Sequence, residues 1–547
     1  MHASTATAHP TKKSMIQRSW CQIAPHEKLL CDYATGDQWL HALLAGADHA
    51  GTPSKEAADA VEATMEPLIL SDEQREALDR LRTGAAVVIG GQQVGHLGGP
   101  LYTWLKIASI IERARREHAV PIFWIEDNDH DRAEAQRVGM INQSDQLAFL
   151  DCPPAERYPT QTIVAACRIG PQITDQLAEL ERSLATLPFA KQTIAVLRQC
   201  YGVGRFWSEA FMEWHQQFWA HHGLLFVRSS ILRQLGAMKL LLTHELCNVG
   251  QLAQCVREQT AELIARGYRA QLDVSTVNAF YHQGWRRYRI QAESESSFTA
   301  GQYRFNAGQL LDELDQHPEH FSPSAALRPL VQDALFAPKV SIVGPAELQY
   351  HAQLRSAYSQ WGIRPPSLML RHSATFVPER VIRLLHKHGD QMERFFDPQD
   401  RFDRWVAEIL DRSGVLAQVD TAATSIADIM ASLERAAEQD DPTLGRAVAA
   451  TGHRFGVQLE RLHGKLRHAL RRQREQQLSR LLAARTHLFP GGRLQERVVA
   501  PIYWVCTVGI RQWSDVLLAL AKESNHTHYI ATPNELLSRV VGTQVVQ

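Results

Sequence analysis

The stretch that decides the fold runs from residue 85 to residue 131 and reads AAVVIGGQQVGHLGGPLYTWLKIASIIERARREHAVPIFWIEDNDHD. Its apolar run at residues 85–89 predicts a buried strand, and the run at residues 120–125 predicts a second one. Between them a glycine-rich turn leads into residues 101–117, where apolar residues recur at helical spacing. Strand, helix and strand in this order predict a βαβ unit of a parallel sheet.

Further strands are predicted downstream of this unit. Residues 223–227 (GLLFV) and 340–343 (VSIV) are short apolar runs, each separated from the first unit by long segments with mainly helical patterns. Upstream, SDEQREALDRL at residues 71–81 predicts a helix that Ser71 or Asp72 would cap. The predicted class is therefore α/β, with a Rossmann-like parallel-sheet core interrupted by helical insertions.

A helical region follows the core. Residues 378–487 show long helical patterns, broken at Asp440-Asp441-Pro442-Thr443, where the residue before proline disfavours a helix. An antiparallel helical hairpin is predicted, which ends at the sequence FPGG of residues 489–492. Its second arm carries apolar residues at alternating steps of four and three, which favours a short coiled coil. These residues are Phe455, Leu459, Leu462, Leu466 and Ala469.

Charge and composition exclude several classes of protein. The chain has 547 residues, 45% of them hydrophobic and 21% charged, which is typical of a globular protein of more than one domain. With 58 Lys and Arg against 59 Asp and Glu, no net field favours nucleic acid or an anionic membrane. The segment from residue 454 to residue 485 contains nine Lys and Arg but only two Glu. We interpret these basic residues as the solvated face of a dimerisation helix rather than as an anion-binding surface.

Cysteine usage and hydropathy point to the cytoplasm. The eight cysteines include no CxxC pair, so a zinc ribbon or a thioredoxin-like redox pair is not expected. No apolar run reaches the roughly 20 residues that cross a bilayer, and no apolar segment follows the basic residues near the N-terminus. We expect a cytoplasmic protein with reduced thiols. Residues 1–75 carry no obvious chemistry.

The glycine-rich turn at residues 90–100 joins the first strand to its helix. In α/β folds this is the edge of the sheet at which ligands bind. Five glycines allow close approach of the backbone, and amides at a helix N-terminus attract phosphate or carboxylate groups. The turn matches neither GxGxxG nor GxxxxGK[ST], so it supports neither a dinucleotide fingerprint nor a Walker loop. Alternatively, the glycines serve only a tight turn between strand and helix.

The helix after this turn places Tyr102, Thr103 and Lys106 within one turn, with Tyr102 and Lys106 on one face. Lys106 could balance a phosphate, or it could be an ordinary solvated lysine. A second polar turn follows residue 343, where Gly344-Pro345 leads into a helix with Glu347 and Tyr350. One pocket could gather both turns.

The second strand ends in a cluster of acidic residues and a histidine, Glu126-Asp127-Asn128-Asp129-His130-Asp131. Such groups serve as general bases, as ligands of hard cations or as binders of amino groups. Alternatively, Asp129 or Asp131 would cap the next helix. We favour a functional role for Asp129 and His130. The charged run at residues 489–497, in contrast, is more typical of a docking corner between the helical arm and the core.

Together these segments resemble the bacillithiol-biosynthesis cysteine-adding enzymes, the BshC family, whose core is similar to class I nucleotidylyl-transferase folds. The resemblance covers much of the chain in matching order. It rests on five motifs: GQQxG...GPLYTxxK (Gly91, Gln92, Gln93, Gly95, Gly99, Pro100, Leu101, Tyr102, Thr103, Lys106), PVFW...EDHD (Pro121, Phe123, Trp124, Asp129, His130, Asp131), FSPN..LRP..Q (Phe321, Ser322, Pro323, Leu327, Arg328, Pro329, Gln332), GGPxExxY (Gly344, Pro345, Glu347, Tyr350) and LFP...LQER (Leu488, Phe489, Pro490, Leu494, Gln495, Glu496, Arg497).

The resemblance implies a domain arrangement and a homodimer formed through the coiled coil. The implied boundaries are 1–150 for the first part of the Rossmann-like core, 151–205 for a helical connecting insertion, 206–235 for a core strand and helix, 236–335 for a second insertion, 336–380 for the end of the core, 381–488 for the helical coiled-coil hairpin and 489–547 for a C-terminal segment that packs on the core.

The implied reaction adds cysteine to the amine of glucosaminyl-malate. Forming this amide requires an activated carboxyl group, for which ATP and Mg²⁺ are the suspected cofactors. The candidate catalytic residues are Asp129, His130 and Asp131. The candidate substrate- or nucleotide-binding residues are Gly91, Gln92, Gln93, Gly95, Gly99, Tyr102, Thr103, Lys106, Trp124, Glu347 and Tyr350. No metal ligand is assigned, and neither nucleic acid nor a membrane is an expected partner.

This chain departs from the family pattern at several positions, which bears on its substrate preference. The departures are Asn128, His96, Gly98, Val343, Ser324 and Arg228. Residues 93–96 (QVGH) also resemble the HxGH loop of nucleotidylyl transferases, with Gln93 in place of the first histidine. Two alternatives stay open: a metal-dependent hydrolase built on Asp127, Asp129, His130 and Asp131, and a non-catalytic dimeric scaffold.

Overall fold

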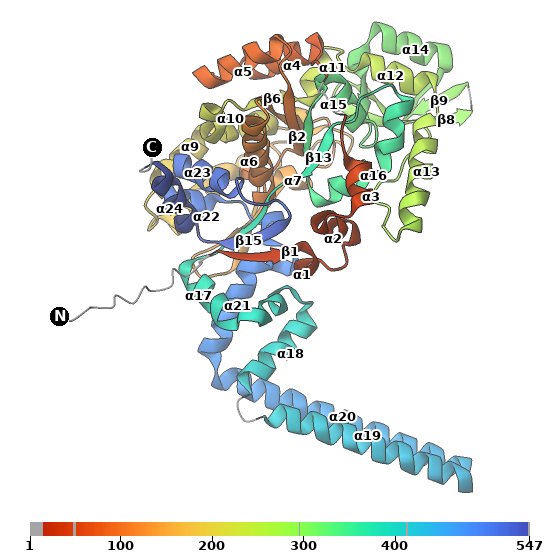
Figure 1. Cartoon of the computed structure of the whole chain (residues 1–547), viewed down its shortest axis with the longest axis vertical. Helices are drawn as coiled ribbons and strands as arrows, with labels where there is room; N and C mark the ends of the chain where they lie inside the picture. Colours follow the sequence, from red (N-terminus) through yellow and green to blue (C-terminus); the bar gives the residue numbers. More distant parts are fainter. Residues whose placement is uncertain (1–14, 48–50, 295, 412–413, 545–547) are drawn as a thin grey trace, which may run out of the picture. The chain divides into compact units, whose positions relative to one another are not determined.

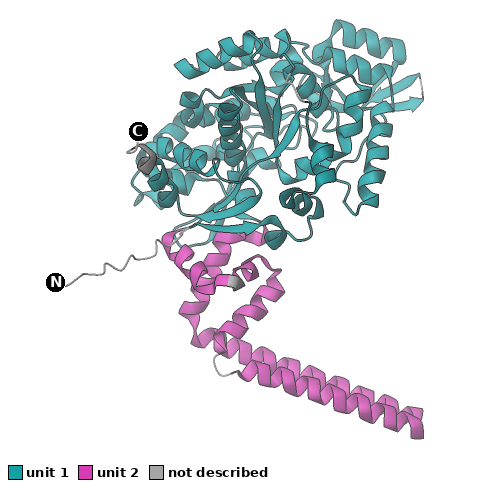
Figure 2. Cartoon of the chain, in the orientation of Figure 1, with its two compact units in different colours: residues 1–377, 494–547 teal, residues 378–493 magenta. Residues whose placement is uncertain are grey.

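The computed structural model describes residues 15–47, 51–294, 296–411 and 414–544 (Figure 1). Two compact units make up the chain. The first contains residues 1–377 and 494–547, and the second contains residues 378–493 (Figure 2).

A five-stranded parallel sheet forms the centre of the first unit, in the order β13-β12-β2-β3-β6. Its strands are β2 (Val87–Gln93), β3 (Val120–Glu126), β6 (Leu225–Arg228), β12 (Val340–Val343) and β13 (Ser367–Leu370). The four strands predicted from apolar runs are confirmed. The sequence pattern missed β13, which is short and whose first and third residues are only half-buried.

Strand β2 is longer than the apolar run predicts, because residues 90–93 continue the pairing with β3 as far as Gln93 opposite Glu126. The start of the predicted turn is therefore a strand. A Cβ added to Gly90 would lie 2.7 Å from the carbonyl oxygen of Ile342 on β12. This glycine thus lets two neighbouring strands approach closely.

Helices cover the parallel sheet. Helix α6 (Leu101–Arg116) packs on β2, β3 and β12, as the βαβ pattern predicts. Helix α5 (Asp72–Arg82) begins at the predicted cap Ser71, whose Oγ accepts a hydrogen bond from the amide of Gln74. Helix α4 (Lys55–Met65) packs on β6. Part of the segment that showed no chemistry therefore covers the core.

The first insertion lies between β3 and β6 and is mainly helical, with one hairpin. Its elements are α7 (Ala133–Gln136), β4 (Arg137–Ile141), β5 (Leu147–Asp151), α8 (Gln172–Leu184), α9 (Ala190–Cys200) and α10 (Trp207–Trp219).

The second insertion, between β6 and β12, is mainly helical as predicted, but it also holds a sheet that the prediction did not include. It contains a five-stranded sheet in the order β10-β9-β8-β7-β11, whose neighbouring strands are all antiparallel. Strands β9 and β10 alternate in burial, as antiparallel strands with one solvated face do, so a search for continuous apolar runs overlooks them. The elements are α11 (Ser229–Gln234), α12 (Lys239–Cys247), α13 (Gln251–Ala265), β7 (Ala279–Gln283), β8 (Arg286–Ser294), β9 (Ser297–Ala300), β10 (Tyr303–Asn306), α14 (Ala307–Gln316), η4 (Pro318–His320), β11 (Phe321–Pro323) and α15 (Arg328–Phe336).

A small sheet brings distant parts of the chain together in the order β1-β15-β14. Strand β1 (Ile16–Ser19) runs antiparallel to β15 (Thr527–Ala531), and β14 (Ser373–Phe376) runs parallel to β15. The remaining elements of this unit are α1 (Trp20–Ile23), α2 (Lys28–Thr35), α3 (Gln38–Leu44), α16 (Pro345–Gln360), α22 (Ile502–Val508), α23 (Ile510–Leu520) and α24 (Pro533–Gln544). Helix α23 packs on α6, so the C-terminal segment from Leu494 onward is part of this unit.

The second unit is helical. Its elements are α17 (Glu379–His388), η5 (Gly389–Phe396), α18 (Gln399–Leu410), α19 (Val415–Asp440), α20 (Pro442–Gln473) and α21 (Glu475–Leu488). The predicted break is confirmed, because Asp441 separates α19 from α20 and its side chain accepts from the amide of Thr443. The hairpin consists of α19 and α20 and is narrower than the predicted range 381–488, since shorter helices flank it (Figure 1).

Candidate active site at the carboxyl edge of the parallel sheet

The carboxyl ends of β2, β3, β6 and β12 lie side by side because the strands are parallel neighbours. Gln93 ends β2, Glu126 ends β3, Arg228 ends β6 and Gly344 follows β12. The predicted polar turns therefore meet at one edge of the sheet.

Lys106 on α6 is the most buried cation of this edge, with 1% of its side chain exposed. Its Nζ donates to the carbonyl oxygen of Gly91 at 2.6 Å, to Gln92 Oε1 at 3.0 Å and to Glu347 Oε2 at 2.6 Å. Lys106 is thus not a solvated surface lysine. It connects β2 to the first turn of α16 through Glu347.

Electrostatics favour the ionised form of this carboxylate. Burial opposes ionisation of Glu347, but the Lys106 ammonium and the amide of Gly344 outweigh it, so the pKa of Glu347 is lowered. Burial lowers the pKa of Lys106, and the Glu347 carboxylate partly offsets this effect. The pair is a buried ion pair whose two members depend on each other.

Residues 94–99 are buried, and the amides of Gly98 and Gly99 are bonded within the protein. The Gly98 amide donates to the Tyr201 hydroxyl at 2.9 Å, the Gly99 amide donates to the carbonyl oxygen of His96, and Pro100 has no amide hydrogen. A Cβ on Gly95 would lie 2.5 Å from Cα of Gly99. At Gly95 the absence of a side chain therefore serves close packing, and the Gly98 and Gly99 amides are not free to bind a phosphate.

Two other residues of this motif are also enclosed. Thr103 is 1% exposed on the buried side of α6. His96 Nε2 donates to Gln176 Oε1 on α8 at 2.6 Å, and burial lowers the pKa of His96 to about 4. The neutral, buried ring of His96 does not take the role that the similarity to an HxGH loop would give it.

Asp127 is fully buried and joins β3 to the start of α11. Its carboxylate accepts from the amide and hydroxyl of Ser230, from the Ser229 hydroxyl and from Arg228 Nε at 2.8 Å. Asn128 is also buried and accepts from Arg233 Nε at 3.0 Å. These two residues fix the backbone of the loop, and each Asp127 carboxylate oxygen already accepts two hydrogen bonds.

Asp129 is held by side chains from two other elements. Its Oδ2 accepts from Gln93 Nε2 at 2.5 Å, and its Oδ1 accepts from Arg287 on β8 at 3.2 Å and from the amide of His130. The carboxylate remains 27% exposed. It is an oriented anion at the edge of the sheet that a ligand can still reach.

The other two candidate catalytic residues are more open. His130 has 44% of its side chain exposed, and its Nδ1 lies 3.5 Å from Asp129 Oδ1. Asp131 Oδ1 accepts from the amide of Ala133, the first residue of α7, at 3.0 Å, although the N-cap of this helix is Arg132 and not Asp131. Thus Asp129 and His130 lie together, whereas Asp131 supports α7.

Glu126 and Trp124 lie at the end of β3, next to this loop. Trp124 is fully buried and its Nε1 donates to Glu126 Oε2 at 3.0 Å. Burial raises the pKa of Glu126, and Arg328 and Arg287 oppose this increase. Glu126 is therefore an acid whose protonation depends on the two arginines.

Sequence reasoning missed the contribution of these arginines. Arg287 is 8% exposed, and its buried Nε has no hydrogen-bond partner within the described part of the chain. Arg328 donates to the Tyr350 hydroxyl at 3.1 Å and lies over the ring of Trp124. Arg328 was visible within the LRP motif, but nothing in the alternating pattern of β8 singled out Arg287.

The predicted aromatic residues lie around the same edge. The Tyr102 hydroxyl accepts from Gln92 Nε2 at 3.3 Å and donates to Glu134 Oε2 at 3.2 Å. Burial raises the pKa of Tyr102, and the Glu134 carboxylate raises it further. Tyr102 is thus a hydrogen-bonding phenol that connects β2 to α7.

The LQER stretch supports the fold. Glu496 accepts from Arg371 at 2.7 Å, from the Ser373 hydroxyl at 2.6 Å and from the amide of Ala374. Gln495 exchanges two hydrogen bonds with the backbone of Phe376. Both residues hold β14 in place.

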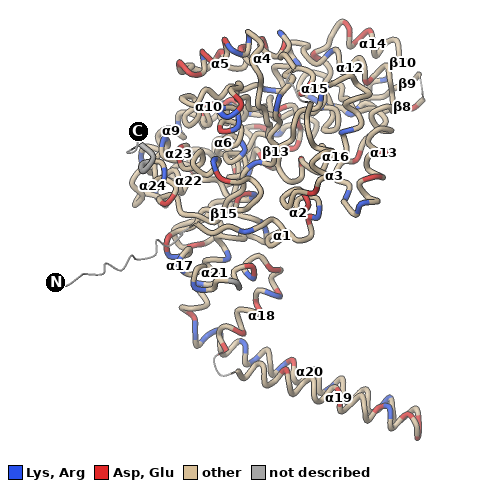
Figure 3. Tube along the Cα trace, in the orientation of Figure 1, with Lys and Arg blue, Asp and Glu red and all other residues tan. Residues whose placement is uncertain are grey.

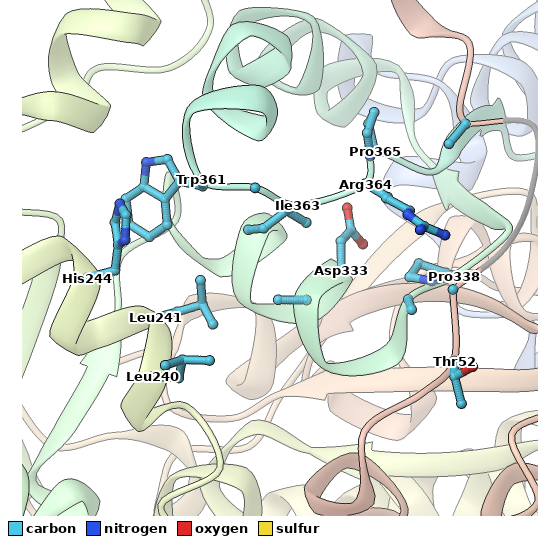
Figure 4. A pocket seen from close by; sticks show the side chains of 15 residues that line it. Thr52, Leu240, Leu241, His244, Asp333, Pro338, Trp361, Ile363, Arg364 and Pro365 are labelled. Carbon is cyan, nitrogen blue, oxygen red and sulfur yellow. The ribbon is translucent and has the colours of Figure 1, made fainter.

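A separate cavity of about 410 Å³ lies near Pro338 and Pro365, which precede β12 and β13 and so mark the opposite edge of the sheet (Figure 4). The rings of Trp361 and His244 lie 4.3 Å apart in its wall. Asp333 also lines it, and burial raises the pKa of Asp333 to about 6 although the Tyr358 hydroxyl donates to it. None of the candidate residues lines this cavity.

The fold and the site together define a class of protein. A parallel Rossmann-like sheet carries charged residues at its carboxyl edge, and a pair of long helices follows the sheet in the sequence. The chain is therefore an α/β protein with a coiled-coil domain. Residues 27–372 match the family model described as the N-terminal Rossmann-like domain of bacillithiol biosynthesis BshC, and residues 374–533 match the C-terminal coiled-coil domain of BshC. The chain belongs to the BshC family of bacillithiol biosynthesis.

Relatives from several bacteria carry the name "Putative cysteine ligase BshC". The protein of Chlorobaculum tepidum is 28% identical over 486 residues, which cover 84% of this chain and 85% of the relative. The protein of Salinibacter ruber is 28% identical over 445 residues, covering 80% and 81%. The protein of Lysinibacillus sphaericus is 23% identical over 543 residues, covering 95% and 98%.

Proposed function

We propose that this chain is a cysteine ligase that joins the carboxyl group of cysteine to the amine of glucosaminyl-malate. The names of its relatives support this reaction. The observation that carries it here is the pairing of an oriented, accessible carboxylate, Asp129, with the cations Arg287 and Arg328 at the same edge. The substrates present an amine and several carboxylates, which these groups complement.

In this proposal Asp129 binds the attacking amine and accepts its proton. The hydrogen bonds from Gln93 and Arg287 hold the carboxylate in one orientation, so little rotational freedom is lost when the amine binds. His130 is the second group within reach of the same proton. Arg328 and Arg287 bind substrate carboxylates.

The carboxyl group of cysteine must be activated before the amine attacks it. We propose that ATP with Mg²⁺ supplies this activation, so that cysteine, glucosaminyl-malate and ATP yield the amide together with either ADP and phosphate or AMP and pyrophosphate. The Gly98 and Gly99 amides have partners within the protein, and Lys106 is paired with Glu347. In this proposal the phosphates therefore bind to groups other than these three.

The hydrolase alternative is not favoured. Asp127 uses its carboxylate oxygens for Ser229, Ser230 and Arg228, and the Arg287 guanidinium beside the accessible Asp129 carboxylate repels a metal cation more than a neutral amine. Cations and amide hydrogens next to a carboxylate compete with a metal ion for its oxygens. Among the described residues, the group with metal-ligand spacing lies elsewhere, at His317, Glu319 and His320.

We also propose a cytoplasmic homodimer that forms through the coiled coil. Within the described residues no helix is long and apolar enough to cross a membrane. The dimer proposal rests on apolar residues that stay exposed on the paired helices, including Ile429 and Leu433.

Mass spectrometry tests the reaction directly. Purified chain is incubated with cysteine and glucosaminyl-malate, with and without ATP and Mg²⁺, and the thiol product and the nucleotide by-product are measured. We expect product only with ATP, and the by-product distinguishes an acyl phosphate from an adenylate. A folded protein that forms no product under any of these conditions would contradict the proposal.

A further inference from the structure

A cluster of imidazole and carboxylate groups lies at the end of α14, outside the sheet-edge site. His317, Glu319 and His320 each offer one ligand atom, and these atoms lie within 4.8 Å of one another. Glu319 Oε1 is 3.3 Å from His317 Nδ1 and 4.0 Å from His320 Nε2. The three residues belong to one short segment that includes the 3₁₀ helix η4, where positions three apart lie above one another.

These separations suit a small transition-metal ion. Ligand atoms of a tetrahedral zinc ion, bound at roughly 2.0–2.1 Å, lie roughly 3.4 Å apart. The distance from Glu319 to His317 already has this value, and the distance from Glu319 to His320 exceeds it by a fraction of an ångström. Small side-chain rotations of partly exposed residues would complete the arrangement.

A second feature points independently to a metal ligand. His320 Nδ1 shares a 2.7 Å hydrogen bond with Glu313 Oε1, which also accepts from the Tyr281 hydroxyl at 3.1 Å. A carboxylate at Nδ1 places the proton on that nitrogen and leaves Nε2 as the free electron-pair donor. Metal-binding histidines are oriented by a carboxylate in this way.

We propose that His317, Glu319 and His320 bind one divalent transition-metal ion of the zinc type, with Glu313 as the outer carboxylate that orients His320. Two imidazoles and one carboxylate favour zinc over magnesium or calcium, which prefer oxygen ligands. The side chains of His317 and Glu319 are 49% and 41% exposed, so water can occupy the fourth position.

The site is linked to the catalytic edge by one side chain. Arg233 donates to the carbonyl oxygen of Glu319 through its guanidinium and to Asn128 Oδ1 at 3.0 Å through Nε. A bound ion would fix the Glu319 peptide and thereby the loop that carries Asn128 and Asp129. The proposal nevertheless concerns metal binding alone and does not depend on the ligase reaction.

Equilibrium dialysis of the full chain, purified without a histidine tag, against Zn²⁺ tests the site. We expect one zinc bound per chain, and we expect His317→Ala to weaken binding at least tenfold. Glu313→Gln should weaken it by roughly 10- to 100-fold, as loss of an outer carboxylate does. His26→Ala removes another exposed histidine and is the matched control, which should retain wild-type affinity.

Two further readouts keep the test decisive. Co²⁺ in place of zinc should give the visible absorption of a four-coordinate site with nitrogen and oxygen ligands, and zinc should raise the melting temperature of the wild type but not of His317→Ala. Circular dichroism verifies that the variants are folded. Absence of zinc binding, or equal binding by the wild type and His317→Ala, would overturn the proposal.

Discussion

Asp129 is a carboxylate that the rest of the chain orients without burying. Gln93 ends β2 and Arg287 lies on β8, so residues about 36 and 158 positions away in sequence hold its two oxygens. Replacing Asp129 by Asn puts an amide group beside two donors and removes the proton acceptor. We expect turnover to fall by roughly 10²- to 10⁴-fold, as for a lost general base, with the fold retained.

The measurement is the initial rate of thiol formation by mass spectrometry, with circular dichroism as the check of folding. Asp151→Asn is the matched control, because Asp151 on β5 is 57% exposed and pairs with Arg137 at the surface. Its rate should equal that of the wild type. If Asp129→Asn retained full turnover, Asp129 would have no part in the mechanism.

The Lys106–Glu347 pair determines stability at the same edge. Lys106→Met leaves the Glu347 carboxylate, the Gly91 carbonyl and Gln92 without their shared donor. We expect a loss of about 3–5 kcal/mol in the free energy of unfolding, the usual cost of breaking a buried ion pair. The double variant Lys106→Met/Glu347→Gln should lose less than the sum of the two single variants.

Urea denaturation of the two single variants and the double variant measures this coupling. The exposed Lys191 on α9 supplies the control, and Lys191→Met should leave the unfolding midpoint unchanged. Strictly additive losses would show that the two side chains do not act as a pair.

At the residue scale, sequence identified most of the side chains at the edge but not their partners. Spacing placed Lys106 and Tyr102 on one helix face, and strand order placed Asp129 beside β2. What spacing could not show is that Tyr201 and His215, far along the chain, fill the space around the glycine turn, with Tyr201 accepting from the Gly98 amide and His215 bonding to the Gly98 carbonyl oxygen. In a turn that looks open to phosphate, both polar groups of Gly98 are therefore bonded to protein side chains.

At the scale of elements, α12 is fixed to the start of β7 through a buried carboxyl group. Glu245 on α12 accepts from the amide of Asn278 at 2.7 Å and from its side chain at 3.1 Å, while its second oxygen has no partner within the described residues. Burial raises the pKa of Glu245 to about 7, although both Asn278 groups favour the charged form. The folded protein thus binds this proton more tightly than the unfolded chain.

The raised pKa of Glu245 determines the direction in which stability changes with pH. The unfolded glutamate has a pKa near 4.3, so the contribution of Glu245 is present below that pH and is lost as the pH rises to about 7. We expect Glu245→Gln to remove this loss. The stability difference, variant minus wild type, should increase by up to about 3 kcal/mol between pH 4.5 and pH 8.

Urea denaturation across this pH range gives the difference. Taking a difference is necessary because buried neutral histidines such as His215, whose pKa burial lowers to about 3, destabilise the protein as the pH falls below 6.5. Glu258→Gln on the exposed side of α13 is the control and should show a constant difference. A constant difference for Glu245→Gln as well would contradict a proton bound at this carboxyl group.

Predictability also varied among the elements. Continuous apolar runs identified β2, β3, β6 and β12, because strands buried on both faces need apolar residues throughout. Strands with a solvated face alternate instead, as in β8 with Tyr288 and Ile290 between polar residues, and these strands were missed. The sheet β1-β15-β14 was also missed, since its strands come from three separate parts of the chain and no local pattern pairs them.

At the scale of the whole molecule, the basic residues of α20 lie beside acidic residues of α19. Helix α20 carries seven Lys and Arg against one Glu, whereas α19 carries five Asp and Glu against one Arg. Figure 3 shows both signs of charge along this helix pair. His463 on α20 lies 3.7 Å from Asp420 on α19. The acidic residues of α19 offset most of the basic excess of α20, which favours a solvated, paired helix over an anion-binding surface.

The same hairpin leaves apolar side chains uncovered. Ile429 and Leu433, four residues apart on α19, are 57% and 51% exposed, and Phe455 and Leu462 on α20 are 48% and 44% exposed. Exposed apolar residues that repeat along one helix face favour association with a second copy. We expect a dimer by size-exclusion chromatography with light scattering.

The double variant Ile429→Glu/Leu433→Glu places two carboxylates on this face, so burying it would cost more free energy than its apolar contacts supply. We expect a folded monomer, with helical content unchanged because both positions are exposed. Thr424→Glu/Ala431→Glu adds the same charge at exposed positions roughly opposite on α19 and should remain dimeric. A dimer that survives Ile429→Glu/Leu433→Glu would show that this face of α19 is not the interface, and a monomeric wild type would show that the exposed residues do not mediate self-association.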